Sequence, residues 1–397
     1  MISRTFHPHV NARLHTASLI RLASHKEEFT VIARLRSALV SKRRFARSCA
    51  ALALAVAVAA ALGYRSASAA GQVNLLETGS SLLYPLFNAW VPAYHNLHPE
   101  VRITTQSTGS GTGMSQAIAG IAQIGASDAF LSPAIMRMHS DMLNIPLVIS
   151  SQMINYNLPG LNRSHVKLSG PVLAGIYDGS IRMWNDGQIA AMNPGVKLPN
   201  HAIIPIHRSD GSGDTFIFTQ YLAFSAPSWS GKYSYGTTIS WAPVPGGLGA
   251  VGNPGMLTAL SGNPYSIAYI GSSYEDGINS AGMGIAMLKN HDGHFVLPSE
   301  ATVNAAAAAM VSKTPADERV SLIFAPGAES YPIINYEYAL VKADQPAQDR
   351  AQALRQFLTW AMSPSGGSAT SYMNKLHFVA LPPSVVKLSQ AQVAKIH

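Results

Sequence analysis

The sequence predicts an α/β protein of two lobes joined by a hinge. The chain has 397 residues, about the length of two average domains. After residue 70, short apolar strand-like segments alternate with amphipathic helical segments, which is typical of α/β proteins. Two long strand-like runs, at 146–159 and 332–342, lie far apart, as a hinge requires when the chain leaves one lobe and later returns. The expected parts are a leader at 1–70, lobe I at 71–152 and 334–397, and lobe II at 153–333.

The leader has the pattern of an export signal. A basic stretch, SKRRFAR at 41–47, precedes the apolar run CAALALAVAVAAALG at 49–63, and SASAA at 66–70 offers small residues for cleavage. This predicts an extracytoplasmic or periplasmic protein, with translation starting near Val40. The apolar run is short for a membrane span, which needs about 20 residues, and a retained anchor is the alternative. The single cysteine, Cys49, lies in this leader, so disulfides and thiol chemistry are not expected in the exported chain.

The basic charge of the chain belongs to the leader. The formal net charge is +8, but residues 1–70 hold 11 of the 28 basic residues and only two of the 20 acidic ones. The remaining chain has 17 basic and 18 acidic residues, a net charge of −1, and a nucleic-acid partner is therefore not expected. Charged residues make up 12% and hydrophobic residues 47% of the sequence, which is enough apolar material for a large core.

The elements follow from hydrophobic periodicity. Strands are predicted at 72–79 and 101–108, with a helix between them at 84–99 that ends before Pro99. A second helix is predicted at 113–125 from the spacing of its apolar residues, which are Met114, Ala117, Ile118, Ile121 and Ile124. After the two long strands, a helix at 347–362 has its buried face at Leu354, Phe357, Leu358 and Ala361. The Gly-, Ser- and Pro-rich stretch at 225–255 is interpreted as a structured excursion.

Three segments place Ser, Thr and Gly directly before an apolar helical run. They are TGSSLLYP at 78–85, STGSGTG at 107–113 and RSDGSGD at 208–214. Helix N-termini leave backbone N–H groups without partners and carry partial positive charge, and glycine lets a ligand approach the backbone closely. One such corner alone is best explained as a helix cap. Three of them in one chain favour a shared oxyanion.

An arginine and an aspartate make the oxyanion hypothesis more specific. Arg208 supplies a planar fork of donors that can hold two oxygens. Asp128 cannot donate while ionised, so it suits an anion that retains a proton, as phosphate does and sulfate does not. The alternative for Asp128 is an ordinary loop or cap residue. Asp210 is expected to hold the guanidinium of Arg208, with turn formation as its alternative.

These motifs resemble those of the phosphate-binding protein of high-affinity phosphate ABC transporters. The resemblance rests on TGSSLLYP, TGSGTG…IGASDAFLS and HRSDGSGDTFIFTQYL, and it extends over residues 72–390. It implies a type II periplasmic-binding-protein fold, with phosphate held in the cleft between two lobes joined by crossing strands. It also implies a monomer that delivers inorganic phosphate to the permease subunits of the transporter.

The resemblance further implies a ligand set. The phosphate-binding residues expected from it are Leu82, Leu83, Tyr84, Ser110, Asp128, Arg208, Ser212, Gly213 and Asp214. The first corner contributes backbone N–H groups, Ser110 its N–H and hydroxyl, and Asp128 accepts the phosphate proton. Leu83 and Asp214 stand where some members of the family have threonine. Asp214 therefore either contacts the ligand or turns away to cap the helix.

Two other classes of function are alternatives. A nucleotide- or phosphoester-handling enzyme is suggested by GSGTG at 109–113, but the third glycine of a dinucleotide-binding motif is missing. A surface adhesin or phosphate sensor of the same fold is the other alternative. Neither a catalytic motif nor a clustered His/Asp set is evident, so no enzymatic activity, cofactor or metal is expected. His207 is expected to lie behind the site or at the surface.

Overall fold

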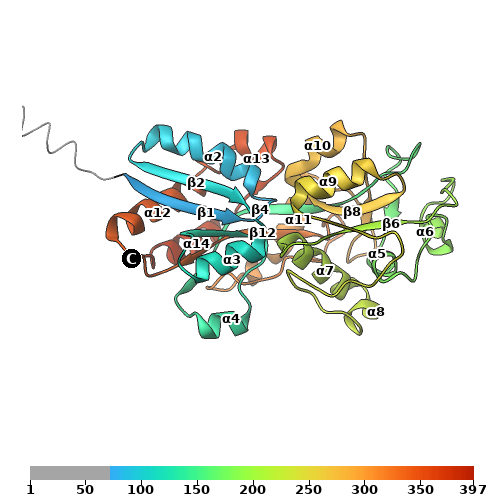
Figure 1. Ribbon diagram of the computed structural model, residues 1–397, viewed down its shortest axis with the longest axis horizontal. Helices are drawn as coiled ribbons and strands as arrows, with labels where there is room; N and C mark the ends of the chain where they lie inside the picture. The colour runs from blue at the N-terminus through green and yellow to red at the C-terminus, as the bar shows by residue number, and fades with distance from the viewer. Residues whose placement is uncertain (1–71) are drawn as a thin grey trace, which may run out of the picture. The chain divides into compact units, whose positions relative to one another are not determined.

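A ten-stranded mixed sheet runs through residues 72–397, the part of the chain that the computed structural model describes. The strand order is β2-β1-β3-β12-β4-β8-β6-β7, and β13 and β9 each pair with β4. Figure 1 shows β1 and β2 toward one end of the sheet and β8 and β6 toward the other, with β4 and β12 between them. Its strands are β1 Val73–Gly79, β2 Val101–Ser107, β3 Ile124–Ser127, β4 Met142–Tyr156, β6 Ile204–Arg208, β7 Leu248–Ala250, β8 Ser266–Gly271, β9 Gly284–Ile285, β12 Ile334–Lys342 and β13 Val379–Ala380. The predicted α/β class is confirmed. The predicted signal peptide, anchor alternative and Cys49 lie outside the described residues.

A small second sheet and a set of helices complete the fold. The second sheet has the order β11-β10-β5, with β5 Lys167–Leu168, β10 Met287–Lys289 and β11 Phe295–Val296. The helices are α2 Tyr84–Leu97, α3 Ser110–Ile118, α4 Pro133–Met138, α5 Gly170–Asp178, α6 Gly187–Met192, α7 Gly213–Ser225, α8 Pro227–Ser230, α9 Gly252–Gly262, α10 Glu275–Ser280, α11 Glu300–Met310, α12 Gln348–Ala361, α13 Thr370–Lys375 and α14 Pro383–Val393, with 3₁₀ turns at Ser272–Tyr274 and Val311–Lys313. Among residues 72–397, no helix is both long and apolar enough to cross a bilayer.

Strand β4 joins the two halves of the sheet. All 15 of its residues are buried. Its first part, up to Ser151, pairs antiparallel with β12, and from Gln152 onward it pairs with β8. We call β2, β1, β3 and β12 with their helices the first half, and β8, β6 and β7 with theirs the second half. The predicted lobe boundaries stay a prediction, since the described residues form one compact unit.

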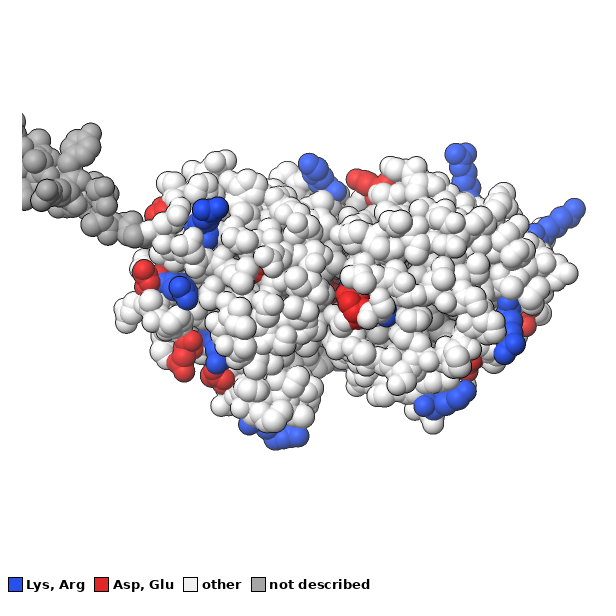
Figure 2. Space-filling model, viewed as in Figure 1, with Lys and Arg blue, Asp and Glu red and all other residues white. Residues whose placement is uncertain are grey.

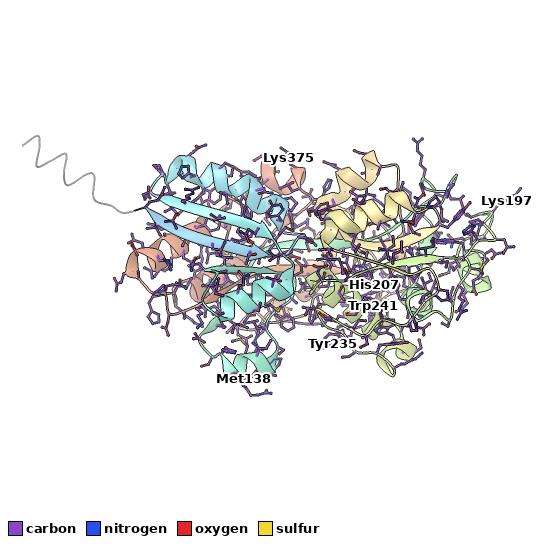
Figure 3. The ribbon with its side chains drawn as sticks, viewed as in Figure 1. Met138, Lys197, His207, Tyr235, Trp241 and Lys375 are labelled. Carbon is purple, nitrogen blue, oxygen red and sulfur yellow. The ribbon has the colours of Figure 1, made fainter. Side chains whose placement is uncertain are left out.

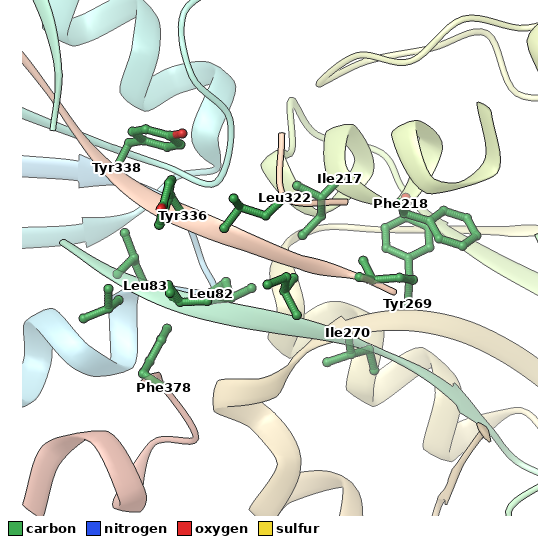
Figure 4. Packing of buried hydrophobic residues seen from close by; sticks show 14 of the residues in the cluster. Leu82, Leu83, Ile217, Phe218, Tyr269, Ile270, Leu322, Tyr336, Tyr338 and Phe378 are labelled. Atoms are coloured by element: carbon green, nitrogen blue, oxygen red, sulfur yellow. The ribbon is translucent and has the colours of Figure 1, made fainter. Parts of the chain in front are cut away.

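Aromatic side chains pack within each half of one continuous hydrophobic core. In the first half, Tyr94 of α2 meets Phe357 of α12 edge-on, with ring centroids 5.1 Å apart. In the second half, Phe218 of α7 stacks on Tyr269 of β8 at 4.5 Å. Figure 4 shows apolar side chains from both halves gathered around β4 and β12. Burial of such large side chains is the main stabilising contribution to the fold, with each contributing roughly 1.5–3 kcal/mol.

The predicted helix at 113–125 is wrong at both ends. Helix α3 begins at Ser110, and it ends at Ile118 because Gly120 adopts a left-handed φ of 70° just beyond it. Ile121 is consequently 61% exposed, and Ile124 begins strand β3. The apolar spacing that suggested one long helix spans a short helix, a turn and a buried strand.

Candidate functional site

The three predicted corners lie at the carboxyl ends of parallel strands. Strand β1 is parallel to both β2 and β3, so these three strands end at one edge of the first half. Strand β6 is parallel to β7 and β8 and ends at Arg208. Open α/β sheets bind ligands beyond such strand ends. The two edges meet, because the N–H of Gly111 on α3 donates to the carbonyl of Gly211 at 2.9 Å.

Ser80 organises the first corner. Its hydroxyl donates to Oδ1 of Asp128 and accepts the backbone N–H groups of Leu82 and Leu83, each at 3.1 Å. The N–H of Tyr84 donates to the carbonyl of Ser80, also at 3.1 Å. The N–H groups of the three residues expected to contact a ligand thus already have partners within the corner. The side chains of Leu82 and Leu83 are fully buried in the core.

Asp128 and Ser110 lie together as predicted. Asp128 follows β3 directly, and Ser110 is the first residue of α3. The Ser110 hydroxyl is 3.3 Å from Oδ2 of Asp128, to which it donates, and it accepts the N–H of Asp128 at 3.3 Å. Asp128 is only 1% exposed. Its carboxyl group therefore has a serine donor on each oxygen, and no lysine or arginine of residues 72–397 donates to it.

Arg208 is held by carboxylates on both edges of its guanidinium group. Its Nε and Nη2 donate to the two oxygens of Asp210, the first at 2.7 Å, which confirms the role expected for Asp210. Its Nη1 donates to Oδ2 of Asp214 at 2.6 Å and to the Ser81 hydroxyl at 3.3 Å. The Arg208 side chain is 1% exposed. This fixes the guanidinium plane but offsets its charge with two acids.

Charge and burial in this cluster shift the pKa values of Arg208 and Asp214. Burial acts to lower the pKa of Arg208, but its hydrogen bond to Asp210 and the charge of Asp214 outweigh burial and raise that pKa. Burial and the charge of Asp128 raise the pKa of Asp214 to about 7, although Arg208 and two amide donors act in the opposite direction. An anion entering this site meets more acids than bases. Neutral donors and its own proton must therefore supply much of its stabilisation.

Gly213 lies at a close approach of the two halves. It is the first residue of α7, which Ser212 caps by accepting the N–H of Thr215 at 3.2 Å. A Cβ atom at Gly213 would lie 2.4 Å from Oδ2 of Asp128 and 2.6 Å from the Ser110 hydroxyl. Only a glycine fits here with the halves in this arrangement. The structure thus brings Ser212 and Gly213 against the Asp128 corner, as the resemblance implied.

A fourth corner was not foreseen from the sequence. After β7, helix α9 begins at Gly252, and Asn253 reaches back into the site. The Asn253 amide donates to Oδ2 of Asp214 at 2.9 Å and to the Ser81 hydroxyl at 3.0 Å. Its sequence context, GAVGNPG at 249–255, contains the strand-to-glycine transition that marks the other corners, and this signal was available within the excursion at 225–255.

Gln152 and Ser81 were missed as well. The Gln152 amide, on the hinge strand β4, donates at 3.1 Å to Oδ1 of Asp214 and to its carbonyl. With Arg208 and Asn253, it surrounds the Asp214 carboxyl group with donors. Asp214 therefore faces protein donors in this structure, and its contact with a ligand stays a prediction.

His207 points away from the site. Its ring stacks on Trp241 at 4.9 Å between centroids, and Figure 3 shows the two residues side by side. Both line a cavity of about 350 Å³ with Tyr177 and Pro243. In residues 72–397, no cluster of three or more His, Cys, Asp or Glu is arranged to hold a metal ion. Charged side chains are few and scattered on the face drawn in Figure 2.

Comparisons with known proteins agree with this geometry. The family model described as the PBP superfamily domain matches residues 65–365. The phosphate-binding protein PstS of Pasteurella multocida is 34% identical over 319 residues, covering 80% of this chain and 89% of that protein. The PstS protein of Methanocaldococcus jannaschii is 30% identical over 334 residues, covering 80% and 84%.

Solved structures share the fold. The periplasmic phosphate-binding protein PfluDING, determined with bound phosphate, superposes with a TM-score of 0.64 at 22% identity, covering 80% of this chain and 93% of that one. A phosphate-binding protein from Stenotrophomonas maltophilia gives 0.63 at 19% identity, with the same coverage. The predicted type II periplasmic-binding-protein fold is thereby confirmed.

Proposed function

Because this chain belongs to the PstS phosphate-binding family within the PBP superfamily, we propose that it binds inorganic phosphate between its two halves. It then delivers the ion to the permease of a phosphate ABC transporter. The resemblance read from the sequence motifs is confirmed by these relatives. The proposal includes no catalytic step.

One observation carries the proposal. Four strand-to-helix corners, two from each half, converge on Asp128 and Arg208, which lie at facing strand ends. Neutral donors at helix N-termini suit an oxyanion, and they distribute its charge without a cluster of cations. Contacts from both halves also explain why an anion stabilises the closed arrangement, since only that arrangement offers all donors at once.

Asp128 supplies the proposed selectivity. Both of its oxygens accept serine hydroxyls, and an ionised carboxylate has about four acceptor sites, so capacity remains for a proton of the ligand. Phosphate brings such a proton near neutral pH. Sulfate does not, and its oxygens would meet the carboxylate without an intervening hydrogen.

The cellular setting is part of the same proposal. The protein acts outside the cytoplasm as a monomer, after export by the signal predicted before residue 71. The neighbour PfluDING is a periplasmic protein, which supports this placement. Docking to permease subunits is supported by the name of a Clostridium perfringens neighbour, a putative phosphate ABC transporter substrate-binding protein with a TM-score of 0.56 and 16% identity.

Calorimetric titration of the purified protein tests the function. The protein is first unfolded and refolded to remove bound ligand, then titrated with phosphate and with sulfate at pH 7.5. We expect one phosphate per chain and no measurable sulfate binding. Asp128→Asn is expected to bind both ions, whereas Gly187→Ala, at an exposed helix start with nothing within 4 Å of its added Cβ, should behave as the wild type. Wild-type protein that binds neither ion would refute the proposal.

A further inference from the structure

Behind Asp128, the two hinge strands present a buried polar face. Directly opposed residues on β4 and β12 share one side of the sheet, and Ser150 pairs with Asn335 in this register. Glu337 lies two residues further along β12 on the same side. Its carboxyl Oε1 accepts the Ser150 hydroxyl at 2.5 Å. The Glu337 side chain is fully buried.

This face adjoins Asp128 directly. Strand β12 is antiparallel to β3, with Tyr338 opposite Ser127, so the next position on each strand brings Glu337 beside Asp128. The Asn335 amide donates to the backbone carbonyl of Asp128, which anchors the two strands at this point. Glu337 is therefore a second carboxyl group next to the one proposed to select the ligand.

The second oxygen of Glu337 has no donor. Among the described residues, its Oε2 has no hydrogen-bond partner. The groups that act on it are Asp128 and, at longer range, Asp214, both of them acids. Burial and the charge of the adjacent Asp128 raise the pKa of Glu337 well above its ordinary value, although the Ser150 hydroxyl acts in the opposite direction. Where two carboxyl groups are buried side by side with no cation between them, the charge of one favours the neutral form of the other.

We propose that Glu337 is a positioning residue, a neutral carboxylic acid whose proton is donated in a hydrogen bond to the carboxylate of Asp128. This inference rests on the proposed function and goes one step further. Ser80, Ser110 and Glu337 then occupy three acceptor sites of Asp128. One site is left, facing the ligand, for a single phosphate proton.

Two substitutions separate this role from a structural one. Glu337→Gln keeps both bonds, because the amide donates to Asp128 and its carbonyl accepts Ser150, and its phosphate affinity is expected to equal that of the wild type. Glu337→Leu removes the donor, and phosphate affinity is expected to fall about tenfold, the usual effect of losing a hydrogen bond to a charged group. Leucine matching the wild type, or glutamine weakening or tightening phosphate binding, overturns the proposal.

A matched control exists in Glu318. It is also a buried glutamate with one serine donor, Ser389 at 2.7 Å, and an unpartnered Oε2, but its charged neighbours are Asp317 and Lys395 instead of Asp128. Glu318→Leu should therefore leave phosphate affinity unchanged while lowering stability. If Glu318→Leu lost as much phosphate affinity as Glu337→Leu, the loss in both variants would come from reduced folding stability, and the proposal would be overturned.

Infrared spectroscopy tests the protonation directly, even if Glu337→Leu fails to fold. The difference spectrum between wild type and Glu337→Gln at pH 7.5, without phosphate, should show the loss of one neutral carboxylic-acid C=O band. Loss of an ionised-carboxylate band instead overturns the proposal. This measurement needs no ligand, so it stands apart from the proposed function. If the wild type itself binds no phosphate, the function fails while the proton at Glu337 is still tested.

Discussion

At the scale of single residues, the site contains several buried carboxyl groups and only one buried cation among residues 72–397. Arg208 is the one arginine or lysine buried among residues 72–397, and it pairs with both Asp210 and Asp214. A buried pair of this kind costs desolvation and is retained where geometry matters more than stability. Here it fixes the guanidinium plane at the end of β6. The arginine thus acts as an oriented donor more than as a free positive charge.

Asp214 should make phosphate binding depend on pH. Its pKa of about 7 lies above the ordinary value because of burial and the charge of Asp128, so it gains a proton as the pH falls through 7. The protonated form removes a negative charge from the site. We expect phosphate affinity to be higher at pH 6 than at pH 8, with a smaller difference in Asp214→Asn, which imitates the neutral acid. Calorimetry at the two pH values measures this, and an equal pH dependence in both proteins would contradict it.

At the scale of elements, helices from the two halves approach each other closely at their N-termini. Helix α7 brings Gly213 against Asp128, and α3 brings Gly111 near Gly211. A Cβ atom added at Gly111 would lie 3.1 Å from the Cα of Gly211. Glycine at these positions is required by the approach of two backbones. A single side-chain atom added at either glycine would therefore hinder closure of the halves.

Gly213→Ala should weaken phosphate binding without unfolding the protein. The added Cβ overlaps Asp128, and overpacking of this kind costs about 1–3 kcal/mol, which corresponds to roughly a tenfold to hundredfold loss of affinity. Titration calorimetry gives the affinity, and denaturant unfolding gives the stability. Gly187→Ala, the first residue of α6, is the matched control. Wild-type affinity in Gly213→Ala would show that the halves do not close as described.

Strand β1 contains a buried acid that should make stability fall with rising pH. Glu77 lies opposite Thr105 of β2 and accepts its hydroxyl, and burial raises the pKa of Glu77 to about 8. A raised folded-state pKa stabilises the protein below the unfolded value of 4.5, and this contribution is lost as the pH rises through 8.

The expected slope is about 1.4 kcal/mol per pH unit between these two values. Glu77→Gln should remove this part of the decline in the free energy of unfolding, measured by urea denaturation from pH 5 to 9. Glu329→Gln, at an exposed position, should decline as the wild type does. A variant Glu77→Gln with the wild-type slope would show that Glu77 ionises without cost.

At the scale of the whole molecule, the fold class and the three corners could be predicted from the sequence because they depend on local patterns. Small residues before apolar runs identified the helix starts, and the two long strands indicated the hinge. The sequence patterns did not indicate Asn253, Gln152 and Glu337, because their roles arise from pairings with distant residues. These pairings span 39 residues for Asn253 with Asp214, 62 for Gln152 with Asp214 and 187 for Ser150 with Glu337. Such contacts depend on strand register, which hydrophobic spacing alone does not specify.

The arrangement of the halves around β4 accounts for the proposed binding mechanism. Asp128 and Ser110 come from the first half, and Arg208 and Asn253 from the second, while β4 continues through both. An anion that contacts all four residues binds the closed form more tightly than the open form, and it therefore stabilises the approach of the two halves.

A crystal structure of the protein grown with phosphate, and without sulfate, tests the central claim most directly. We expect one phosphate ion between the starts of α3 and α7, with one of its oxygens at about 2.5–2.7 Å from a carboxyl oxygen of Asp128, the distance of a charge-assisted O–H···O bond. Phosphate bound elsewhere, or Asp128 turned away from it, would contradict the account.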